Sequence, residues 1–205
     1  MEKTAIRSIT IGVYTIEMTD AAAESDQSLL AAYQRGDLAG FERIYDRYAP
    51  AMLACAIGML GDRAAAEDAL QQVFAKFIKL SPGLPANTNV RAYLFAAVRN
   101  CSVNIRRTRA RTEAACAGYE ALVRPRVNHS PDADAAALAD ELRRELNDAL
   151  ARLGDDERET VLLRTQGGLT FSELAFALGV PRGTAVTRYR SAITKLREML
   201  DHEQK

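Results

Sequence analysis

The segment between Thr170 and Leu200 constrains the fold most strongly, because it encodes a helix start, a helix stop and a second helix start in close succession. Thr170 and Glu173 have the spacing of a capping box, in which each side chain accepts a hydrogen bond from an amide at the start of the helix. Gly179 suits the left-handed residue that ends a helix, and Pro181 suits the first turn of the next helix. The segment therefore predicts two helices joined by a tight turn.

The second of these helices has an apolar face and a basic face. Its apolar positions include Ala185, Tyr189 and Leu196, and five basic residues without any carboxylate lie between Arg182 and Arg197. Arginines and short polar side chains on the first turns of a helix suit the base edges and phosphates of a major groove. The candidate DNA-reading residues on this face are Arg182, Thr184, Thr187, Arg188, Ser191 and Lys195. The alternative is an amphipathic hairpin whose charged face is only solvated.

Helical periodicity also runs through most of the chain before this segment. Apolar residues recur at intervals of three and four from Asp26 to about Arg107, and again from Leu138 onwards, whereas no alternating pattern predicts a sheet. The chain is rich in alanine and has only 12 glycines and 6 prolines, which also favours helices. We expect Pro50 to open a helix and Ser81–Asn89 to form a loop.

The helical pattern divides into two parts. From about residue 112 to residue 135 the period is lost, and Gly118, Pro125 and the run Asn-His-Ser-Pro are typical of a linker. We therefore expect an all-α fold with two small helical domains joined by a flexible linker, the second domain carrying a helix-turn-helix. The expected boundaries are 1–25 for an N-terminal extension without regular structure, 26–111 for the first domain, 112–137 for the linker and 138–205 for the second domain. Met18 is a second candidate start.

Charge is polarised along the chain, although the formal net charge is zero. Six arginines and no carboxylate lie between Arg91 and Thr112, whereas ten carboxylates and four arginines lie between Asp132 and Glu159. The basic block predicts contacts to phosphates, with a solvated helix end as the alternative. The acidic block is most simply a solvated helix face. The sharper hypotheses are that it repels DNA and holds the domains apart, or that it faces a basic surface of a partner.

The sequence lacks the motifs of the common enzyme classes. It has neither a phosphate-binding glycine loop nor a GxSxG motif, and His129 and His202 have no cysteine or carboxylate at metal-ligand spacing. The three cysteines are odd in number and widely spaced, which argues against a zinc site and favours a reducing compartment. No stretch is long and apolar enough to span a bilayer. We therefore expect a cytoplasmic protein without membrane insertion that is not an enzyme and uses no metal or cofactor.

Four runs of sequence, taken in order, resemble a known family. They are Gly36–Tyr48, Gly61–Phe74 (GDRAAAEDALQQVF), Arg91–Asn100 (RAYLFAAVRN) followed by Arg106 and Arg107, and Leu169–Thr184 (LTFSELAFALGVPRGT) with the later Lys195 and Arg197. Together they resemble the extracytoplasmic-function RNA polymerase sigma factors of the sigma-70 family. The resemblance covers about residues 26–107 and 138–200, with a linker between these parts.

The resemblance implies a transcription initiation factor that directs core RNA polymerase to promoters. Its first domain would melt the −10 element, and its second would read the −35 element. Contacts to polymerase would come from Glu67, Asp68, Gln71 and Gln72, although Gln72 stands where the family usually has glutamate. Contacts to the −10 element would come from Asn87, Asn89, Tyr93, Arg99, Asn100, Asn104, Arg106, Arg107 and Arg109. Of these, Asn87 and Asn89 would read a flipped base and Tyr93 would stack.

The implied partners are core RNA polymerase, promoter DNA and an anti-sigma factor. Two other classes stay open from the residues alone. One is a free-standing helix-turn-helix regulator with a helical sensor domain, and the other is an interaction protein that mimics a sigma factor. A sigma factor binds core polymerase and directs transcription, a repressor binds duplex operator alone, and an inhibitor silences transcription by another sigma factor.

Overall fold

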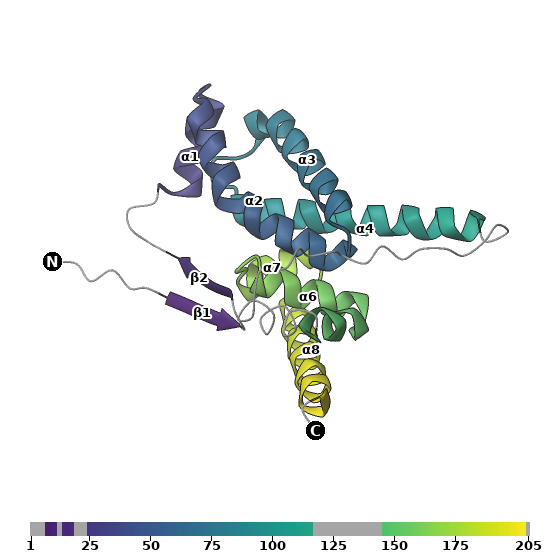
Figure 1. Cartoon of the computed structure of the whole chain (residues 1–205). Helices are drawn as coiled ribbons and strands as arrows, with labels where there is room; N and C mark the ends of the chain where they lie inside the picture. Colours follow the sequence, from purple (N-terminus) through teal and green to yellow (C-terminus); the bar gives the residue numbers. More distant parts are fainter. Residues whose placement is uncertain (1–6, 12–13, 19–23, 117–144, 204–205) are drawn as a thin grey trace, which may run out of the picture.

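The computed structural model describes residues 7–11, 14–18, 24–116 and 145–203 (Figure 1). Residues 117–137, which make up most of the predicted linker, and residues 138–144 of the predicted second domain lie outside the described parts. The helices are α1 (Asp26–Gln34), α2 (Leu38–Leu60), α3 (Arg63–Leu80), the 3-10 helix η1 (Ser81–Gly83), α4 (Val90–Cys116), α6 (Asp155–Thr165), α7 (Phe171–Leu178) and α8 (Arg182–Glu203). Residues 145–152 are also helical.

A two-stranded antiparallel hairpin precedes the helices. Strand β1 (Arg7–Ile11) pairs with β2 (Tyr14–Met18), and Ile9 is the partner of Ile16 in the register. This corrects the expectation that residues 1–25 lack regular structure. Isoleucine and threonine occur in both strands, and their branched Cβ atoms favour an extended backbone. Every other regular element of the described residues is a helix, so the predicted all-helical class is confirmed apart from this hairpin.

Helices α1 to α4 pack around an aromatic core. Phe77 of α3 is fully buried, and its ring lies 6.5 Å from that of Phe41 on α2 and 6.0 Å from that of Tyr93 on α4. Phe74 extends the cluster, with its ring 4.7 Å from that of Tyr45. The core therefore fixes α3 and α4 against α2, and these two helices carry the residues predicted to contact polymerase and the −10 element.

Pro50 lies inside α2 rather than at the start of a helix. Helix α2 runs without a break from Leu38 to Leu60, so the expected helix boundary at Pro50 is wrong. A proline in a helix interior removes one hydrogen bond and costs about 3 kcal/mol. Ile44, Met52 and Cys55, which lie on both sides of the proline, are fully buried. Burial of one continuous apolar stripe compensates for the lost hydrogen bond.

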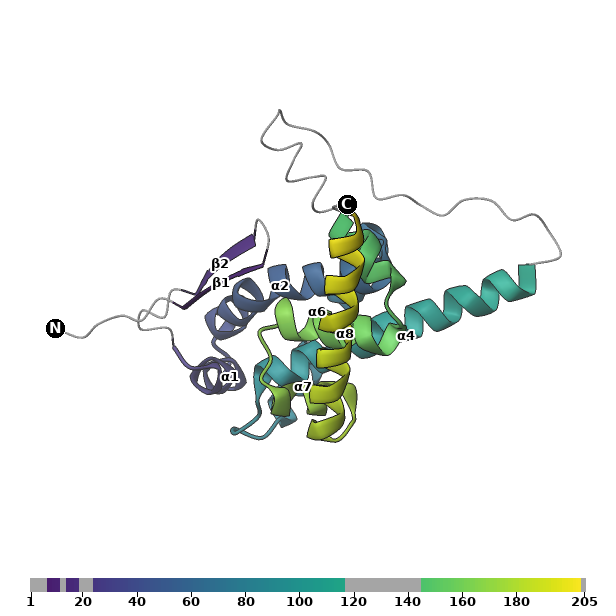
Figure 2. The same ribbon diagram turned by 90° about the horizontal axis from the view of Figure 1, so that it is seen from below.

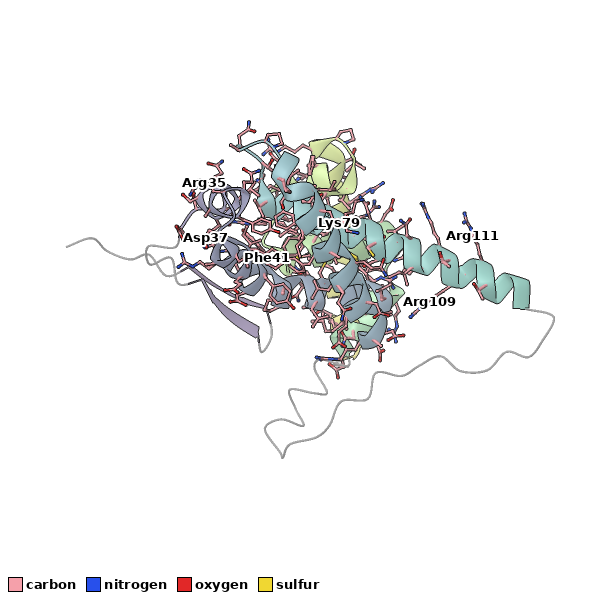
Figure 3. All side chains as sticks on the ribbon, turned by 90° about the horizontal axis from the view of Figure 1, so that it is seen from above. Arg35, Asp37, Phe41, Lys79, Arg109 and Arg111 are labelled. Atoms are coloured by element: carbon pink, nitrogen blue, oxygen red, sulfur yellow. The ribbon has the colours of Figure 1, made fainter. Side chains whose placement is uncertain are left out.

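Helix α4 is longer than its apolar pattern predicts. It continues past Arg107 to Cys116, because neither glycine nor proline interrupts the sequence there and alanine and arginine are strong helix formers. Its last turns project beyond the other helices (Figures 1 and 2). Arg109 and Arg111 lie on this part of the helix and point in different directions (Figure 3). The predicted domain boundary at residue 111 therefore falls inside a helix.

Helices α7 and α8 form the predicted pair with its tight turn. The Thr170 hydroxyl accepts a hydrogen bond from the Glu173 amide at 3.3 Å, and the Thr170 amide donates to the Glu173 carboxylate at 2.7 Å. Gly179 has φ of +67°, and Pro181 stands immediately before α8. The capping box and the left-handed glycine are thus confirmed.

We expect Thr170→Ala to lower the free energy of unfolding of the second domain by about 1 kcal/mol, because the change removes half of the capping box. Urea denaturation followed by circular dichroism measures this loss. Ser172, which is exposed on the same helix, provides the control. Equal losses in Thr170→Ala and Ser172→Ala would show that the cap contributes nothing specific.

The helices after residue 145 pack directly on those before residue 116 (Figure 2). Gly58 of α2 lies so close to Leu162 of α6 that a Cβ atom at residue 58 would be 2.6 Å from a leucine methyl. Similarly, a Cβ atom at Gly167 would lie 3.0 Å from the ring of Phe95 on α4. The two groups of helices are the two predicted helical domains, and they pack on each other through one shared hydrophobic core.

Candidate nucleic-acid interface

The predicted polymerase-binding residues lie on the side of α3 that faces away from the aromatic core. Asp68, Gln71 and Gln72 are exposed. Glu67 is half-buried and forms an ion pair with Arg63 one turn earlier, at 2.8 Å. The opposite side of the helix is buried through Phe74 and Phe77. The arrangement leaves a continuous polar face available to a partner.

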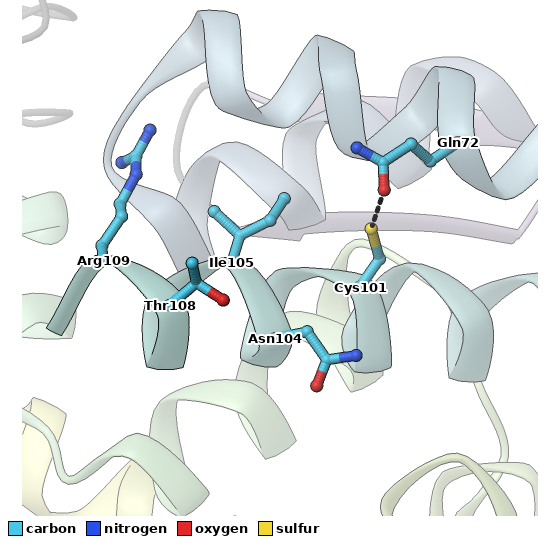
Figure 4. A pocket seen from close by; sticks show the side chains of 6 residues that line it. All are labelled: Gln72, Cys101, Asn104, Ile105, Thr108 and Arg109. Carbon is cyan, nitrogen blue, oxygen red and sulfur yellow. Dashed lines mark hydrogen bonds between the residues drawn. The ribbon is translucent and has the colours of Figure 1, made fainter. Parts of the chain in front are cut away.

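A shallow groove between α3 and α4 brings Gln72 next to two of the predicted −10 residues (Figure 4). It is lined by Gln72, Cys101, Asn104, Ile105, Thr108 and Arg109. The Cys101 thiol donates a hydrogen bond to the Gln72 carboxamide oxygen at 3.6 Å, and burial raises the pKa of this thiol. Polymerase-binding and DNA-binding candidates thus meet along one groove.

Arg109 stabilises the start of α3. Its guanidinium donates to the Asp62 carboxylate at 2.9 Å, and the other oxygen of that carboxylate accepts from the Ala65 amide at 3.2 Å as the helix cap. The amide hydrogen bond, followed by the hydrogen bond from Arg109, holds the pKa of Asp62 below its usual range. Arg109 therefore has a partner within the domain as well as its predicted phosphate contact.

The two candidate base readers lie on the loop before α4 but have different surroundings. The Asn89 carboxamide oxygen accepts from the Ala92 amide at 2.9 Å and caps α4, while its nitrogen donates to Glu173 at 2.8 Å. Asn87 is exposed on the same loop. Both asparagines are predicted base readers, but only Asn87 presents its side chain without a role in capping a helix.

Gln34 holds this loop in place and was missed by the sequence analysis. Its side-chain nitrogen donates to the backbone oxygens of Ser81 at 2.7 Å and Leu84 at 2.9 Å. A glutamine at the end of α1 carries no local signal for a contact so distant in the sequence. The contact ties the loop to the first helix, which fixes the entry to α4.

Apart from Arg109, which faces the start of α3, the predicted −10 residues on α4 lie on two different sides of the helix. Asn100, Asn104 and Arg107 are exposed, and Tyr93, half-buried against Phe77, is at the same helical angle. We call Tyr93, Asn100, Asn104 and Arg107 the exposed stripe. It starts beside the loop that carries Asn87.

Arg99 and Arg106 lie on the other side of α4 and face α6. The Arg99 guanidinium contacts the Glu159 carboxylate at 2.7 Å. The Arg106 guanidinium contacts Asp155 at 2.6 Å and Glu159 at 3.6 Å. The Glu159 side chain is only 3% exposed, so its contacts with the two arginines are buried between the two groups of helices, whereas the Asp155 side chain is exposed. The sequence analysis placed both arginines on DNA and did not anticipate these partners.

The predicted −35 residues of α8 also separate into two sets. Arg182 and Thr187 are exposed on the first turns, and Thr184 is half-buried there. Further along α8, each predicted residue has a carboxylate partner on α6. The contacts are Arg188 to Asp156 at 2.8 Å, the Ser191 hydroxyl to Glu157 at 2.7 Å, and Lys195 to Glu157 at 2.8 Å.

Helix α6 therefore contacts the basic residues on both sides of it. The hydrogen bond from Lys195, together with that from Ser191, holds the pKa of Glu157 below its usual range although partial burial acts in the opposite direction. For Glu157 and Glu159, the simple interpretation of the acidic block as a solvated face is wrong. These carboxylates face a basic surface, and that surface belongs to the same chain.

The described part of the chain holds no group of three or more histidine, cysteine, aspartate or glutamate side chains placed to bind a metal ion. His129 and the side chain of His202 lie outside it. None of the helices that the structure describes is both long and apolar enough to cross a membrane.

Family models match both groups of helices. Residues 44–112 match the model for sigma-70 region 2, and residues 149–198 match the model for sigma-70 region 4. The chain is similar to RNA polymerase sigma factor CarQ of Myxococcus xanthus, with 30% identity over 168 residues, which cover 82% of this chain and 93% of CarQ. It is also similar to ECF RNA polymerase sigma factor SigL of Mycobacterium tuberculosis, with 30% identity over 156 residues, which cover 75% of this chain and 85% of SigL.

Two solved structures share the fold. CnrH, solved in complex with the cytosolic domain of CnrY, has 23% identity and a TM-score of 0.66, and the match covers 87% of this chain and 99% of CnrH. The sigma factor RpoE of Bartonella quintana, solved in complex with the anti-sigma factor NepR, has 25% identity and a TM-score of 0.63. That match covers 78% of this chain and 96% of RpoE.

Proposed function

Because the chain belongs to the extracytoplasmic-function (ECF) group of the sigma-70 family of RNA polymerase sigma factors, which direct polymerase to promoters through regions 2 and 4, we propose how its residues divide that work. Residues 26–116 act on polymerase and the −10 element, and residues 145–203 act on the −35 element. The polar face of α3, with Glu67, Asp68, Gln71 and Gln72, docks on core polymerase.

The exposed stripe of α4 is the feature that supports the −10 assignment most strongly. It combines an aromatic ring, two carboxamides and a guanidinium along one side of a helix, and it begins beside Asn87. Single-stranded DNA is bound by stacking on aromatic rings and by a cationic path for the phosphates. We propose that Asn87 reads an unstacked base of the −10 element, that Tyr93 stacks on its neighbour, and that Arg107 contacts the backbone.

Helix α8 reads the −35 element in the major groove. Arg182, Thr184 and Thr187 lie on its first turns, where a recognition helix meets base edges. Arg188 follows Thr187 directly, one turn after Thr184, and can form two hydrogen bonds to a guanine.

One further partner is suggested by a relative. Sigma factors bind core RNA polymerase and promoter DNA, and we propose that this chain does so in the cytoplasm. Bartonella quintana RpoE was solved with an anti-sigma factor. We propose that an anti-sigma factor binds this chain as well.

Run-off transcription with purified core polymerase tests the assignment. We expect the full chain to bind core polymerase and to yield transcripts from a subset of promoters in a genomic library. If the chain binds duplex operator DNA without polymerase and yields no transcript on any promoter, it acts as a free-standing regulator, and the proposed division of work is wrong.

We expect Arg188→Ala to weaken transcription from promoters that depend on the −35 element by about five- to hundredfold, because one bidentate contact to a base contributes about 1–3 kcal/mol. Arg190→Ala is the matched control, since Arg190 is exposed on the opposite side of α8. Run-off assays on a promoter with an intact or scrambled −35 element measure the effect. Full activity of Arg188→Ala on every promoter would contradict the reading role.

A further inference from the structure

Helix α6 connects the two helices that the proposed function assigns to DNA. On one side, Asp155 and Glu159 form ion pairs with α4, and on the other, Asp156 and Glu157 bind α8 (Figures 1 and 2). Three of these carboxylates belong to the first turn of α6, where negative charge is favoured by the helix dipole. The helix therefore presents an acidic surface that is complementary to two basic DNA-binding surfaces at once.

The contacts of Glu159 on α6 with α4 are buried rather than solvated. The side chains of Arg99 and Arg106 are 22% and 24% exposed, and that of Glu159 is 3% exposed. One guanidinium nitrogen of Arg106 is buried without any hydrogen-bond partner. A charge in such a place is stable only while its counter-charge is present. The three side chains therefore hold one another, and none of them can bind another group without opening the contact.

Other contacts extend this interface over α2, α4 and α7. Leu162 packs on Gly58, and the Asn89 carboxamide donates to Glu173 at 2.8 Å. The Arg91 guanidinium also donates to the backbone oxygen of Gly168 at 3.4 Å. Polar and apolar contacts thus hold region 4 against region 2, on a side of α4 other than the one that carries the exposed stripe.

This closed arrangement is incompatible with binding both promoter elements. The −10 and −35 elements are separated by about 25 base pairs, or about 85 Å at 3.4 Å per base pair. Regions 2 and 4 cannot be in contact with each other and occupy both elements. In addition, Arg188, Ser191 and Lys195 are bound to carboxylates at distances of 2.7–2.8 Å, where bases and phosphates would have to compete for them.

We propose that α6 is an autoinhibitory element, whose carboxylates occupy the basic groups of α4 and α8 and hold regions 2 and 4 together until DNA or polymerase separates them. The inference rests on the proposed assignment of these basic residues to DNA. In the free chain, α6 acts as an internal competitor of promoter DNA. Opening exposes Arg99 and Arg106, whose partners Asp155 and Glu159 move away with α6.

Glu159→Gln tests the closure, because the change keeps the shape of the side chain and removes the charge that holds Arg99 and Arg106. We expect small-angle X-ray scattering of the full chain to give a larger radius of gyration for this variant. Glu157→Gln is the matched control on the same helix. Its partners Ser191 and Lys195 both lie on α8, so this variant should keep the wild-type radius of gyration.

Gly58→Leu provides a second test that changes no charge. A side chain at this position meets Leu162 across the interface, whereas replacing a glycine in a helix interior favours the helix itself. Circular dichroism verifies that the helices are retained. We expect this variant, like Glu159→Gln, to bind a labelled 40-base-pair duplex about fivefold or more tightly than the wild type when polymerase is absent.

Scattering and transcription decide different questions. If both Glu159→Gln and Gly58→Leu retain the wild-type radius of gyration and duplex affinity, α6 does not close the molecule and the inference is wrong. If both variants open while no form of the chain directs transcription with core polymerase, the closure stands and the proposed function is overturned.

Discussion

Replacing Phe77 with alanine is expected to lower the free energy of unfolding by about 3–5 kcal/mol, the loss typical of a buried phenylalanine. Phe77 is fully buried where α2, α3 and α4 meet, and its ring lies within 6.5 Å of the rings of Phe41 and Tyr93. Truncation leaves a cavity that these aromatic side chains cannot fill without moving. Region 2 would then lose the fixed position of α4 on which the exposed stripe depends.

Ile78 offers a control one residue away. Its side chain is 42% exposed, so Ile78→Ala removes little buried surface and is expected to cost less than about 1 kcal/mol. Guanidinium denaturation followed by circular dichroism compares the two variants, and run-off transcription at increasing temperature follows the consequence. We expect Phe77→Ala to lose activity at a lower temperature than Ile78→Ala. Equal stability of the two variants would show that the aromatic core does not hold these helices together.

The helix-turn-helix was predictable because its signals are local. Thr170 and Glu173 are three residues apart, and Gly179 follows the same short helix. Each residue acts on the backbone within one turn of itself, so the sequence contains nearly all the information required. The order of the helices and the family resemblance follow from similarly local patterns.

The boundaries of the longer helices were less predictable. Pro50 is a strong local signal for a helix start, but burial along the whole of α2 outweighs it. At the end of α4, the apolar pattern stops near Arg107 while the helix continues to Cys116. An apolar period marks where a helix is buried, and a helix that projects into solvent carries no such mark.

Contacts between the two regions could not be predicted from the sequence. Arg99 and Glu159 are 60 residues apart, and opposite charge alone does not choose among the basic residues of the chain. The sequence does indicate, however, which of the residues on α4 share one side of the helix. Tyr93, Asn100 and Arg107 are seven residues apart, as are Arg99 and Arg106, and a spacing of seven places residues on one side of a helix. The basic block therefore encodes two surfaces rather than one.

That division changes how variants of the basic block should be interpreted. Substitution of Arg107 removes a basic side chain from the exposed stripe. Substitution of Arg99 removes a candidate DNA contact and also the counter-charge of Glu159, which is buried. We therefore expect Arg107 variants to lower the affinity for DNA alone. Arg99 variants should lower the affinity for DNA and also weaken the contact between regions 2 and 4. For this reason, the residue that tests −10 recognition most cleanly is Asn87, which lies on the loop before α4.

Asn87→Ala is expected to reduce the formation of open promoter complexes by about five- to hundredfold, because loss of the hydrogen bonds to one base costs about 1–3 kcal/mol. Asn87 is exposed on the loop that Gln34 holds, so its removal should leave the free energy of unfolding unchanged. Permanganate reactivity of unpaired thymines in the −10 element measures opening directly, and denaturation verifies the stability.

Asn89→Ser separates base reading from helix capping at the neighbouring candidate. Serine can still cap α4, as the Asn89 oxygen does for the Ala92 amide, but it lacks the carboxamide nitrogen that donates to Glu173. If Asn87 is the base reader and Asn89 is a cap, Asn89→Ser retains promoter opening while Asn87→Ala loses it. The reverse result would assign the base to Asn89. It would also require the contact between Asn89 and Glu173 to break before the promoter opens, which makes the separation of regions 2 and 4 a step on the way to transcription.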